Sequence, residues 1–492
     1  MKSAGSILPA ESFKPYVDAF NADDVEDVIQ AIPNAEAYAW MAANVPRFNC
    51  PDQTIEEIYY YRWWTFRKHI RETPDGLVVT EFILPVKHAG PHNTISCALC
   101  LQIAEGRWLA DPKYISEYTR FWFRGNEGKA QPHLHKYSQW TSKAVWDRYA
   151  QSGDASEMLG LLDDFVADYE LWETEKQLPN GLFWQFDVRD GMEESISGSR
   201  KQKNPRPTIN SYMYVSARTI ADIAKMAGKP EIEQRFREKA AALKKLTQEQ
   251  LWDPAAKFFK VMFEDGSLSD AREAIGFIPW CFDLPDAGYE EAWEQLIDPQ
   301  GFWAPFGITT AERRHPKLRS HGVGRCEWDG AVWPFCTTQT LDALANVLRH
   351  YKQNAVTREH YLESMHTYAM SHHRNGKPYL GEYLDEMNGE WLKGDNPRSR
   401  YYNHSTFCDL VITGLVGLVP RTDSTVEIDP LLPEGRWDYF CLEDVPYHGR
   451  KLMIVWDRDG TRYGRGEGLS VFADGARIGH SSTLQRLTAP LG

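Results

Sequence analysis

The chain has 492 residues, of which 42% are hydrophobic, 25% charged and 13% aromatic. These fractions exclude a disordered chain, and the length excludes a small scaffold held together by disulfides. The formal net charge is −14, and the sequence has no basic cluster of five or six residues. Because nucleic acids and anionic membranes bind positive surfaces, we expect neither as a partner.

The first twenty residues contain no apolar segment of signal-peptide length, and no stretch of 18 apolar residues occurs. Eight cysteines are scattered along the chain. We therefore expect a cytoplasmic protein with reduced thiols and no membrane span. The oligomeric state stays open, although acidic enzymes of this size often form homo-oligomers.

Helical periodicity dominates from about residue 11 to residue 418. Leu161, Phe165, Tyr169 and Trp172 follow at spacings of four, four and three, with acidic residues between them. This pattern predicts one amphipathic helix. Roughly a dozen segments show the same pattern, including 220–226, 236–251, 341–348 and 411–416. We predict an all-α fold of antiparallel helical hairpins arranged in a ring.

The last seventy residues have a different pattern. Apolar and polar residues alternate at 425–428, 452–456 and 469–472, with Asp-Gly pairs at 459–460 and 474–475. Alternation bounded by Asp-Gly predicts β-hairpins. We therefore predict a catalytic domain over 1–420 and a small antiparallel β appendage over 421–492. A further antiparallel segment is expected at 76–84.

One loop, from Trp184 to Gly198, places Asp187, Asp190, Glu193 and Glu194 among bulky apolar residues. Desolvation penalises the charged form of a carboxyl group, so these acids are candidates for a raised pKa. The alternative is a solvated acidic loop that caps the following helix. Composition alone does not separate the two.

A second acidic loop, from Tyr379 to Trp391, places Glu382, Asp385 and Glu386 among aromatic residues. Two such loops are what a pair of facing catalytic carboxyl groups would look like, because glycoside hydrolysis needs one acid and one carboxylate. Between them, the segment Trp328–Trp333 carries Asp329. This segment is either part of the site or simply the start of a helix whose N-terminus Asp329 caps.

These three loops resemble the signature loops of glycoside hydrolase family 63 and its mannosylglycerate hydrolase-like relatives, which are inverting, exo-acting enzymes built on an (α/α)6 toroid. The resemblance implies that Glu193 is the general acid and Glu382 the general base, and that 328–333 lines the sugar pocket. Glu193 stands where the family has Asp, Asp329 where it has Arg, and Glu386 where it has Pro. The identity of the substrate is therefore not carried over.

Further side chains are expected to contact the sugar. The run Tyr59–Trp64 is either a sugar-stacking wall or a core helix face. The segment 206–212 either supplies Asn210 and Tyr212 to the pocket or begins the next helix, with Thr208 as its cap. His92 and His404 are either hydrogen-bond partners for sugar hydroxyls or packing residues. The complete set of expected binding residues is Arg62, Trp63, Trp64, His92, Asp190, Asn210, Tyr212, Trp328, Asp329, Trp333 and His404.

We expect neither a cofactor nor a metal, because the His and Cys pairs lack a third ligand at a recognised spacing. A small carbohydrate is the expected substrate and an exo-acting glycoside hydrolase the expected function. The alternatives are another (α/α)6 carbohydrate-active enzyme, namely a phosphorylase, epimerase or lyase, or a sugar-binding protein without catalysis.

Overall fold

The structure is a computed structural model that describes residues 6–90, 92–322 and 326–492. It is rich in helices up to residue 415, and strands follow. The α-helices are α1 (Lys14–Asp23), α2 (Asn34–Asn44), α3 (Gln53–Lys68), α4 (Ser96–Gly106), α5 (Lys113–Arg124), α6 (Thr141–Ser152), α7 (Ser156–Gly160), α8 (Leu162–Lys176), α9 (Asp187–Asp190), α10 (Pro207–Met226), α11 (Pro230–Gln250), α12 (Glu294–Ile297), α13 (Pro334–His350), α14 (Arg358–Ser371) and α15 (Cys408–Leu410).

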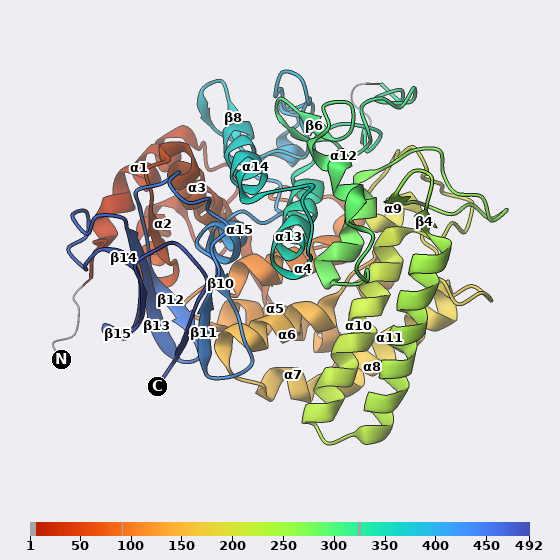
Figure 1. Ribbon diagram of the computed structural model, residues 1–492, viewed down its shortest axis with the longest axis horizontal. Helices are drawn as coiled ribbons and strands as arrows, with labels where there is room; N and C mark the ends of the chain where they lie inside the picture. Colours follow the sequence, from red (N-terminus) through yellow and green to blue (C-terminus); the bar gives the residue numbers. More distant parts are fainter. Residues whose placement is uncertain (1–5, 91, 323–325) are drawn as a thin grey trace.

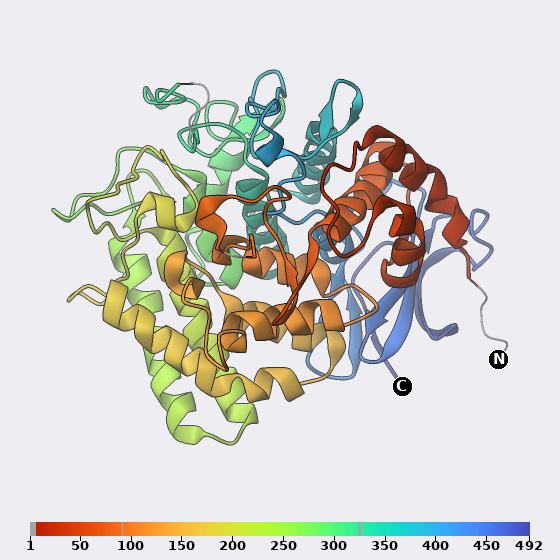
Figure 2. The ribbon, with the colours of Figure 1, turned by 180° about the vertical axis from the view of Figure 1, so that it is seen from behind.

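The helical segments predicted from the sequence are observed as α8, α10, α11 and α13, while 411–416 forms a π-helical turn over Val411–Leu415. Helix α8 buries Leu162, Phe165, Tyr169 and Trp172, as expected from their spacing. Helices α10 and α11 form an antiparallel hairpin, because Gly228 adopts a φ of 65° and Pro230 begins the second helix. This hairpin lies on the side of the molecule opposite the β-sheet (Figures 1 and 2).

Short hairpins interrupt the helices, and longer strands follow residue 417. The strands are β1 (Arg47–Asn49), β2 (Ile70–Thr73), β3 (Gly76–Val79), β4 (Trp252–Asp253), β5 (Phe258–Phe259), β6 (Trp303–Ala304), β7 (Gly307–Ile308), β8 (His373–Arg374), β9 (Lys377–Pro378), β10 (Leu418–Val419), β11 (Thr425–Ile428), β12 (Tyr439–Tyr447), β13 (Arg450–Asp457), β14 (Gly468–Ala473), β15 (Ala476–Ser481) and β16 (Leu487–Pro490).

The C-terminal strands form an antiparallel sheet in the order β1-β12-β13-β14-β15, and β10, β11 and β16 form a second one. The predicted Asp474-Gly475 turn joins β14 to β15, with both residues at positive φ as a tight hairpin requires. Asp459-Gly460, by contrast, lies in the longer loop between β13 and β14. The predicted segment 76–84 is a strand only as far as Val79, where β3 pairs with β2.

The edge strand β1 comes from the N-terminal part of the chain, with Arg47 opposite Glu443. One cluster of buried apolar side chains also extends from Phe13 to Leu491. The helical and β parts therefore share a core, and the division of the chain at residue 420 stays a prediction. None of the helices in the described part of the chain is long and apolar enough to cross a bilayer.

Candidate active site

A cavity lies where several loops meet just before the N-termini of helices. Its walls come from the segments that precede α4, α6, α10, α13 and α15 and from the loop that carries Glu382. It encloses about 540 Å³ of space not filled by atoms, including its opening to solvent.

The loop that carries Glu193 is fixed by the buried side chain of Asp187. Its carboxylate accepts hydrogen bonds from the backbone N–H groups of Val188 (2.7 Å) and Glu194 (3.2 Å). Gly198 closes the loop, and a Cβ atom there would lie 2.6 Å from Asp187 Oδ2, so only glycine fits. These contacts hold the backbone on both sides of Glu193 in one conformation.

Glu193 lines the cavity and is partly buried. Burial raises the pKa of its carboxyl group to about 7, and the negative charges of Glu382 and Asp187 act in the same direction. A carboxyl group with this pKa is about half protonated at neutral pH, so a large fraction of the molecules can give a proton to a leaving group. This agrees with the prediction of a raised pKa in this loop.

Glu382 lines the same cavity but has a different environment. Its side chain is buried and pairs with two cations, Arg398 Nη2 at 3.0 Å and Lys393 Nζ at 3.2 Å. The Ser399 hydroxyl donates a third bond at 3.2 Å. These partners suit a carboxylate that accepts a proton from water.

Glu382 and Trp333 meet because a short β-bridge joins their segments. Val332 N donates to Leu384 O at 3.0 Å, and Leu384 N donates back to Val332 O at 2.9 Å. Trp333 stacks between Trp328 (4.9 Å between ring centroids) and Tyr383 (4.7 Å), and it lines the cavity. Because rings cover both of its faces, Trp333 presents only the edge of its indole to the cavity.

His404 is the other predicted binding residue that lines this cavity. Burial lowers the pKa of its imidazole well below the ordinary value, and the nearby charge of Arg62 adds to this. Neither ring nitrogen has a hydrogen-bond partner among the described residues, and the same is true of Trp333 Nε1. A neutral imidazole has one hydrogen-bond donor and one acceptor, and the indole N–H is a donor. These three nitrogens are therefore available to form hydrogen bonds with a bound polar ligand.

The expectation of a sugar-stacking wall on the Tyr59–Trp64 segment is not met at this cavity. Trp63 and Trp64 are buried on α3 in the core, as the alternative interpretation stated. Arg62 is also buried, and it donates to the carbonyl of Ser405 and contacts His372 Nε2 at 3.1 Å. Arg62 therefore supports the loop that carries His404 without lining the cavity itself.

Asp190, Asn210 and Tyr212 also lie behind the cavity wall. The side chain of Asn210 bonds to both backbone groups of Phe183 at 2.8 Å, and Tyr212 donates to Gln339 Oε1 at 2.6 Å. Asp190 accepts from Ser138, Arg206 and Thr208. The Thr208 hydroxyl is used in this bond, and it does not cap α10 as the alternative proposed. All three predicted binding residues have structural partners instead.

The remaining predicted positions also lie outside the cavity lining. Trp328 is the buried inner ring of the aromatic stack. Asp329 does not cap α13, since it accepts from His321 N at 3.0 Å and pairs with His321 Nδ1 at 2.9 Å. His92 packs its ring against Phe121, with 5.5 Å between centroids. The presence of a polar residue in an aromatic-rich loop of the sequence is therefore not enough to predict that its side chain binds the sugar.

Sequence reasoning missed several residues that line the cavity, above all Glu81, Arg398 and Tyr402. Glu81 follows β3 in an ordinary strand context, and Arg398 lies in a short turn beyond the loop of Glu382. Neither belongs to a recognisable local motif. Only the proximity of Arg398 to Glu382, at 3.0 Å, indicates its role.

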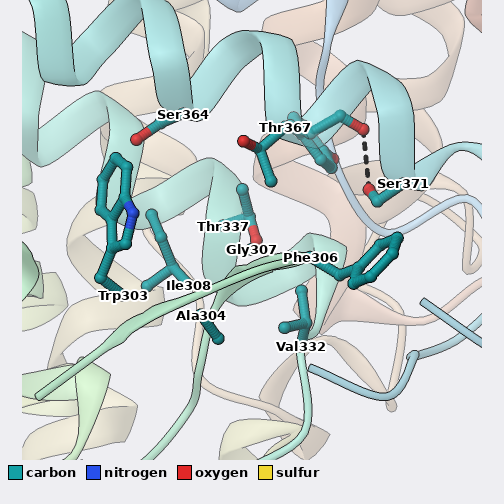
Figure 3. A pocket seen from close by; sticks show the side chains of 11 residues that line it. Trp303, Ala304, Phe306, Gly307, Ile308, Val332, Thr337, Ser364, Thr367 and Ser371 are labelled. Atoms are coloured by element: carbon teal, nitrogen blue, oxygen red, sulfur yellow. Dashed lines mark hydrogen bonds between the residues drawn. The ribbon is translucent and has the colours of Figure 1, made fainter. Parts of the chain in front are cut away.

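A second cavity lies between the β6–β7 hairpin and helices α13 and α14 (Figure 3). Trp303, Phe306 and Ile308 face Thr337 and the α14 side chains Ser364 and Thr367 across it. The residues that line it include no carboxyl, imidazole or amino side chain. It therefore lacks the pair of carboxyl groups that the cavity of Glu193 and Glu382 provides, and the latter is the candidate active site.

Residues 90–405 match the family described as the mannosylglycerate hydrolase MGH1-like glycoside hydrolase domain. The chain belongs to this MGH1-like glycoside hydrolase family. The resemblance stated from three loops is thereby confirmed, and residues 421–480 additionally match the C-terminal domain of glycosyl hydrolase family 65. Both matches are to domains of glycoside hydrolase families.

Several solved structures are similar to this chain. A structure titled "Sialidase" is 49% identical, with a TM-score of 0.97 over 98% of this chain; this chain spans 45% of that protein. The glycoside hydrolase family 63 mannosylglycerate hydrolase of Thermus thermophilus, in complex with glucose, is 13% identical with a TM-score of 0.52, covering 72% of this chain and 98% of that one. A family 78 rhamnosidase of Bacillus sp. GL1 is 12% identical with a TM-score of 0.57, covering 84% and 40%. The last two are similar in fold.

Proposed function

We propose that this MGH1-like chain is an exo-acting glycoside hydrolase that inverts the anomeric configuration, with Glu193 as general acid and Glu382 as general base. One observation carries the proposal. A single cavity holds two glutamates in opposite environments, one with a pKa raised to about 7 and one paired with two cations. Two carboxyl groups with separated roles are what glycoside hydrolysis requires.

In the proposed reaction, Glu193 donates its proton to the glycosidic oxygen as the bond from that oxygen to the anomeric carbon breaks. Glu382 takes a proton from a water molecule, whose oxygen attacks the anomeric carbon from the opposite face. The product sugar therefore has the inverted configuration, and each carboxyl group ends in the other protonation state. Inversion requires about 6.5–9.5 Å between the two carboxyl groups, which leaves room for the water.

The lining of the cavity supports the binding of one terminal sugar. Trp333 supplies the edge of its indole, including Nε1. His404 and the Nε atom of Arg398, which like Trp333 Nε1 lack a partner among the described residues, supply further polar contacts. The walls come from five loops that precede helices. We accordingly propose that the helices form an (α/α)6 toroid, with the cavity at the end where these loops gather.

The name of the 49% identical structure indicates the first substrates to test. We propose that the terminal sugar is a sialic acid, an acidic sugar. Its carboxylate would be attracted by Arg398, whose Nη2 pairs with Glu382 but whose Nε has no partner among the described residues. This part of the proposal depends on that relative, of which this chain spans less than half. It is therefore tested separately from the reaction class.

The deciding experiment follows product formation by proton NMR with α-sialosides and a panel of neutral disaccharides and aryl glycosides. We expect release of a sugar whose first-formed anomer is inverted, and loss of that release in Glu193→Gln and Glu382→Gln. Glu194→Gln is the matched control, because Glu194 is adjacent and its side chain pairs with the exposed Arg200. Release with retention would contradict the role of Glu382, and release of neutral sugars alone would contradict the sialic acid.

A further inference from the structure

A third glutamate, Glu81, lines the same cavity as Glu193 and Glu382. Its backbone N–H donates to Asn93 O at 3.2 Å, and its carbonyl accepts from Asn403 N at 2.9 Å. These two bonds fix the residue between the segment before α4 and the segment that carries His404. The side chain is only 3% exposed, so its carboxyl group is held inside the cavity wall.

The partners of Glu81 differ in charge from those of Glu382. Two cations pair with Glu382, whereas no ion pair within the described ranges involves Glu81. Its carboxyl group instead accepts bonds from neutral donors, the Cys97 thiol at 3.6 Å and the Tyr402 hydroxyl. Of these two glutamates, only Glu382 therefore has its charge compensated by ion pairs.

The ionisable groups around Glu81 do not favour its charged form. Burial and, to a smaller extent, the charges of Glu193 and Glu382 raise the pKa of Glu81 to about 8, against the bonds from Tyr402 and Cys97, which lower it. Arg398 and His88 also line the cavity, but Arg398 is already paired with Glu382. The acidic groups that face it from the packed elements are Cys97, Tyr118, Tyr137, Glu193, Glu382 and Tyr402. Glu81 is consequently protonated at neutral pH.

We propose that Glu81 is a third functional carboxyl group of this cavity, which donates a hydrogen bond to an oxygen of the bound sugar and so selects the substrate without transferring a proton. The inference rests on the proposed function for its ligand. A protonated carboxyl group is a donor that ionisation converts into an acceptor. Ionised Glu81 would also repel the carboxylate of an acidic sugar. Binding should therefore depend on the protonation of this side chain.

The test compares Glu81→Gln and Glu81→Ala with the wild-type protein. Glutamine is neutral and keeps an N–H donor, so it mimics the protonated acid, whereas alanine removes the donor. Glu72→Gln, exposed on the neighbouring strand β2, is the matched control. Binding of N-acetylneuraminate and of mannose is measured by calorimetry between pH 6 and 9.5, beside kcat and KM for a cleaved glycoside.

We expect Glu81→Ala to weaken binding and raise KM by about 3- to 10-fold, as for one lost hydrogen bond, with little change in kcat. Glu81→Gln should bind like the wild type at pH 6.5. Wild-type affinity should fall as the pH rises through about 8, and this fall should be absent in Glu81→Gln. A stronger pH effect for N-acetylneuraminate than for mannose would identify the carboxylate as the acceptor, and equal effects would identify a hydroxyl group.

Two results would overturn the proposal. If Glu81→Gln lost turnover as completely as Glu193→Gln, Glu81 would be a proton donor. If Glu81→Ala, with an unchanged melting temperature, bound both sugars like the wild type at every pH, Glu81 would have no part in recognition. A failure of the proposed function would look different from a failure of this inference. In that case the wild-type protein would cleave none of the glycosides, while its sugar binding would still depend on Glu81.

Discussion

Arg206 and Asp190 form a fully buried ion pair, with 2.6 Å between Nε and Oδ2 and no exposure of either side chain. Asp190 ends α9, three residues before Glu193, and Arg206 precedes α10. The Ser138 and Thr208 hydroxyls complete the hydrogen bonds of the carboxylate. The pair therefore fastens the loop of the proposed acid to the start of the next helix.

We predict that Asp190→Asn destabilises the protein by about 3–5 kcal/mol, because it leaves the buried Arg206 charge uncompensated. The free energy of unfolding is measured by urea denaturation. The control is Asp222→Asn, which breaks the exposed pair with Arg237 and should cost about 1 kcal/mol or less. Equal effects of the two substitutions would contradict the assigned role of the buried pair.

We predict that the activity of Glu193→Gln depends on the leaving group. Loss of a general acid should reduce kcat by about 10²- to 10⁴-fold for substrates with a poor leaving group. An aryl glycoside with an acidic phenol needs little protonation and should lose much less. The ratio of the two rates, measured in Glu193→Gln and in wild type, tests this. An equal loss on both substrates would argue against Glu193 as the proton donor.

The pH profile of kcat/KM provides an independent test. Because Glu193 must be protonated to donate, activity should fall as the pH rises through about 7. Replacement of Glu194, which lies outside the cavity lining, should leave this limb in place. If the residual activity of Glu193→Gln fell with pH in the same way as the wild-type activity, the fall above about pH 7 would belong to another group.

The stability of the folded protein should also depend on the protonation of Glu81 and should fall as the pH rises. Its folded-state pKa of about 8 lies above the ordinary value of 4.5, so the folded state binds more protons than the unfolded state between these values. The stabilising contribution is complete below about pH 4.5 and is lost as the pH rises through about 8. We expect the melting temperature of Glu81→Gln, relative to wild type, to increase over this interval. A constant difference would contradict the assignment.

We predict that His404→Ala weakens substrate binding more than it slows turnover. The imidazole lines the cavity, and both ring nitrogens lack a partner among the described residues, so its loss removes up to two hydrogen bonds to the sugar. KM should rise by about 5- to 30-fold, at about 1 kcal/mol for each bond. His92→Ala, outside the cavity lining, is the control and should leave KM unchanged. A rise in KM in both variants would indicate indirect effects.

The sequence by itself determined the features that depend on local periodicity and local motifs. The spacing of Leu161, Phe165, Tyr169 and Trp172 defines α8, and Asp474-Gly475 defines a hairpin, because both patterns act over a few residues. The order of three loops was enough to identify the family. Their residues Glu193, Glu382 and Trp333 line one cavity, although they are far apart in the sequence.

Only the tertiary structure decided which polar and aromatic side chains face that cavity. Arg62, Asp190 and Asn210 were expected to bind the sugar, but each bonds to groups behind the wall. Glu81 and Arg398 had no local signal, and both line the cavity with Glu382. The physical reason is that burial and ion pairing arise between segments that are distant in the chain. The same residue type therefore becomes an acid, a base or a structural anchor according to the groups that the fold brings to it.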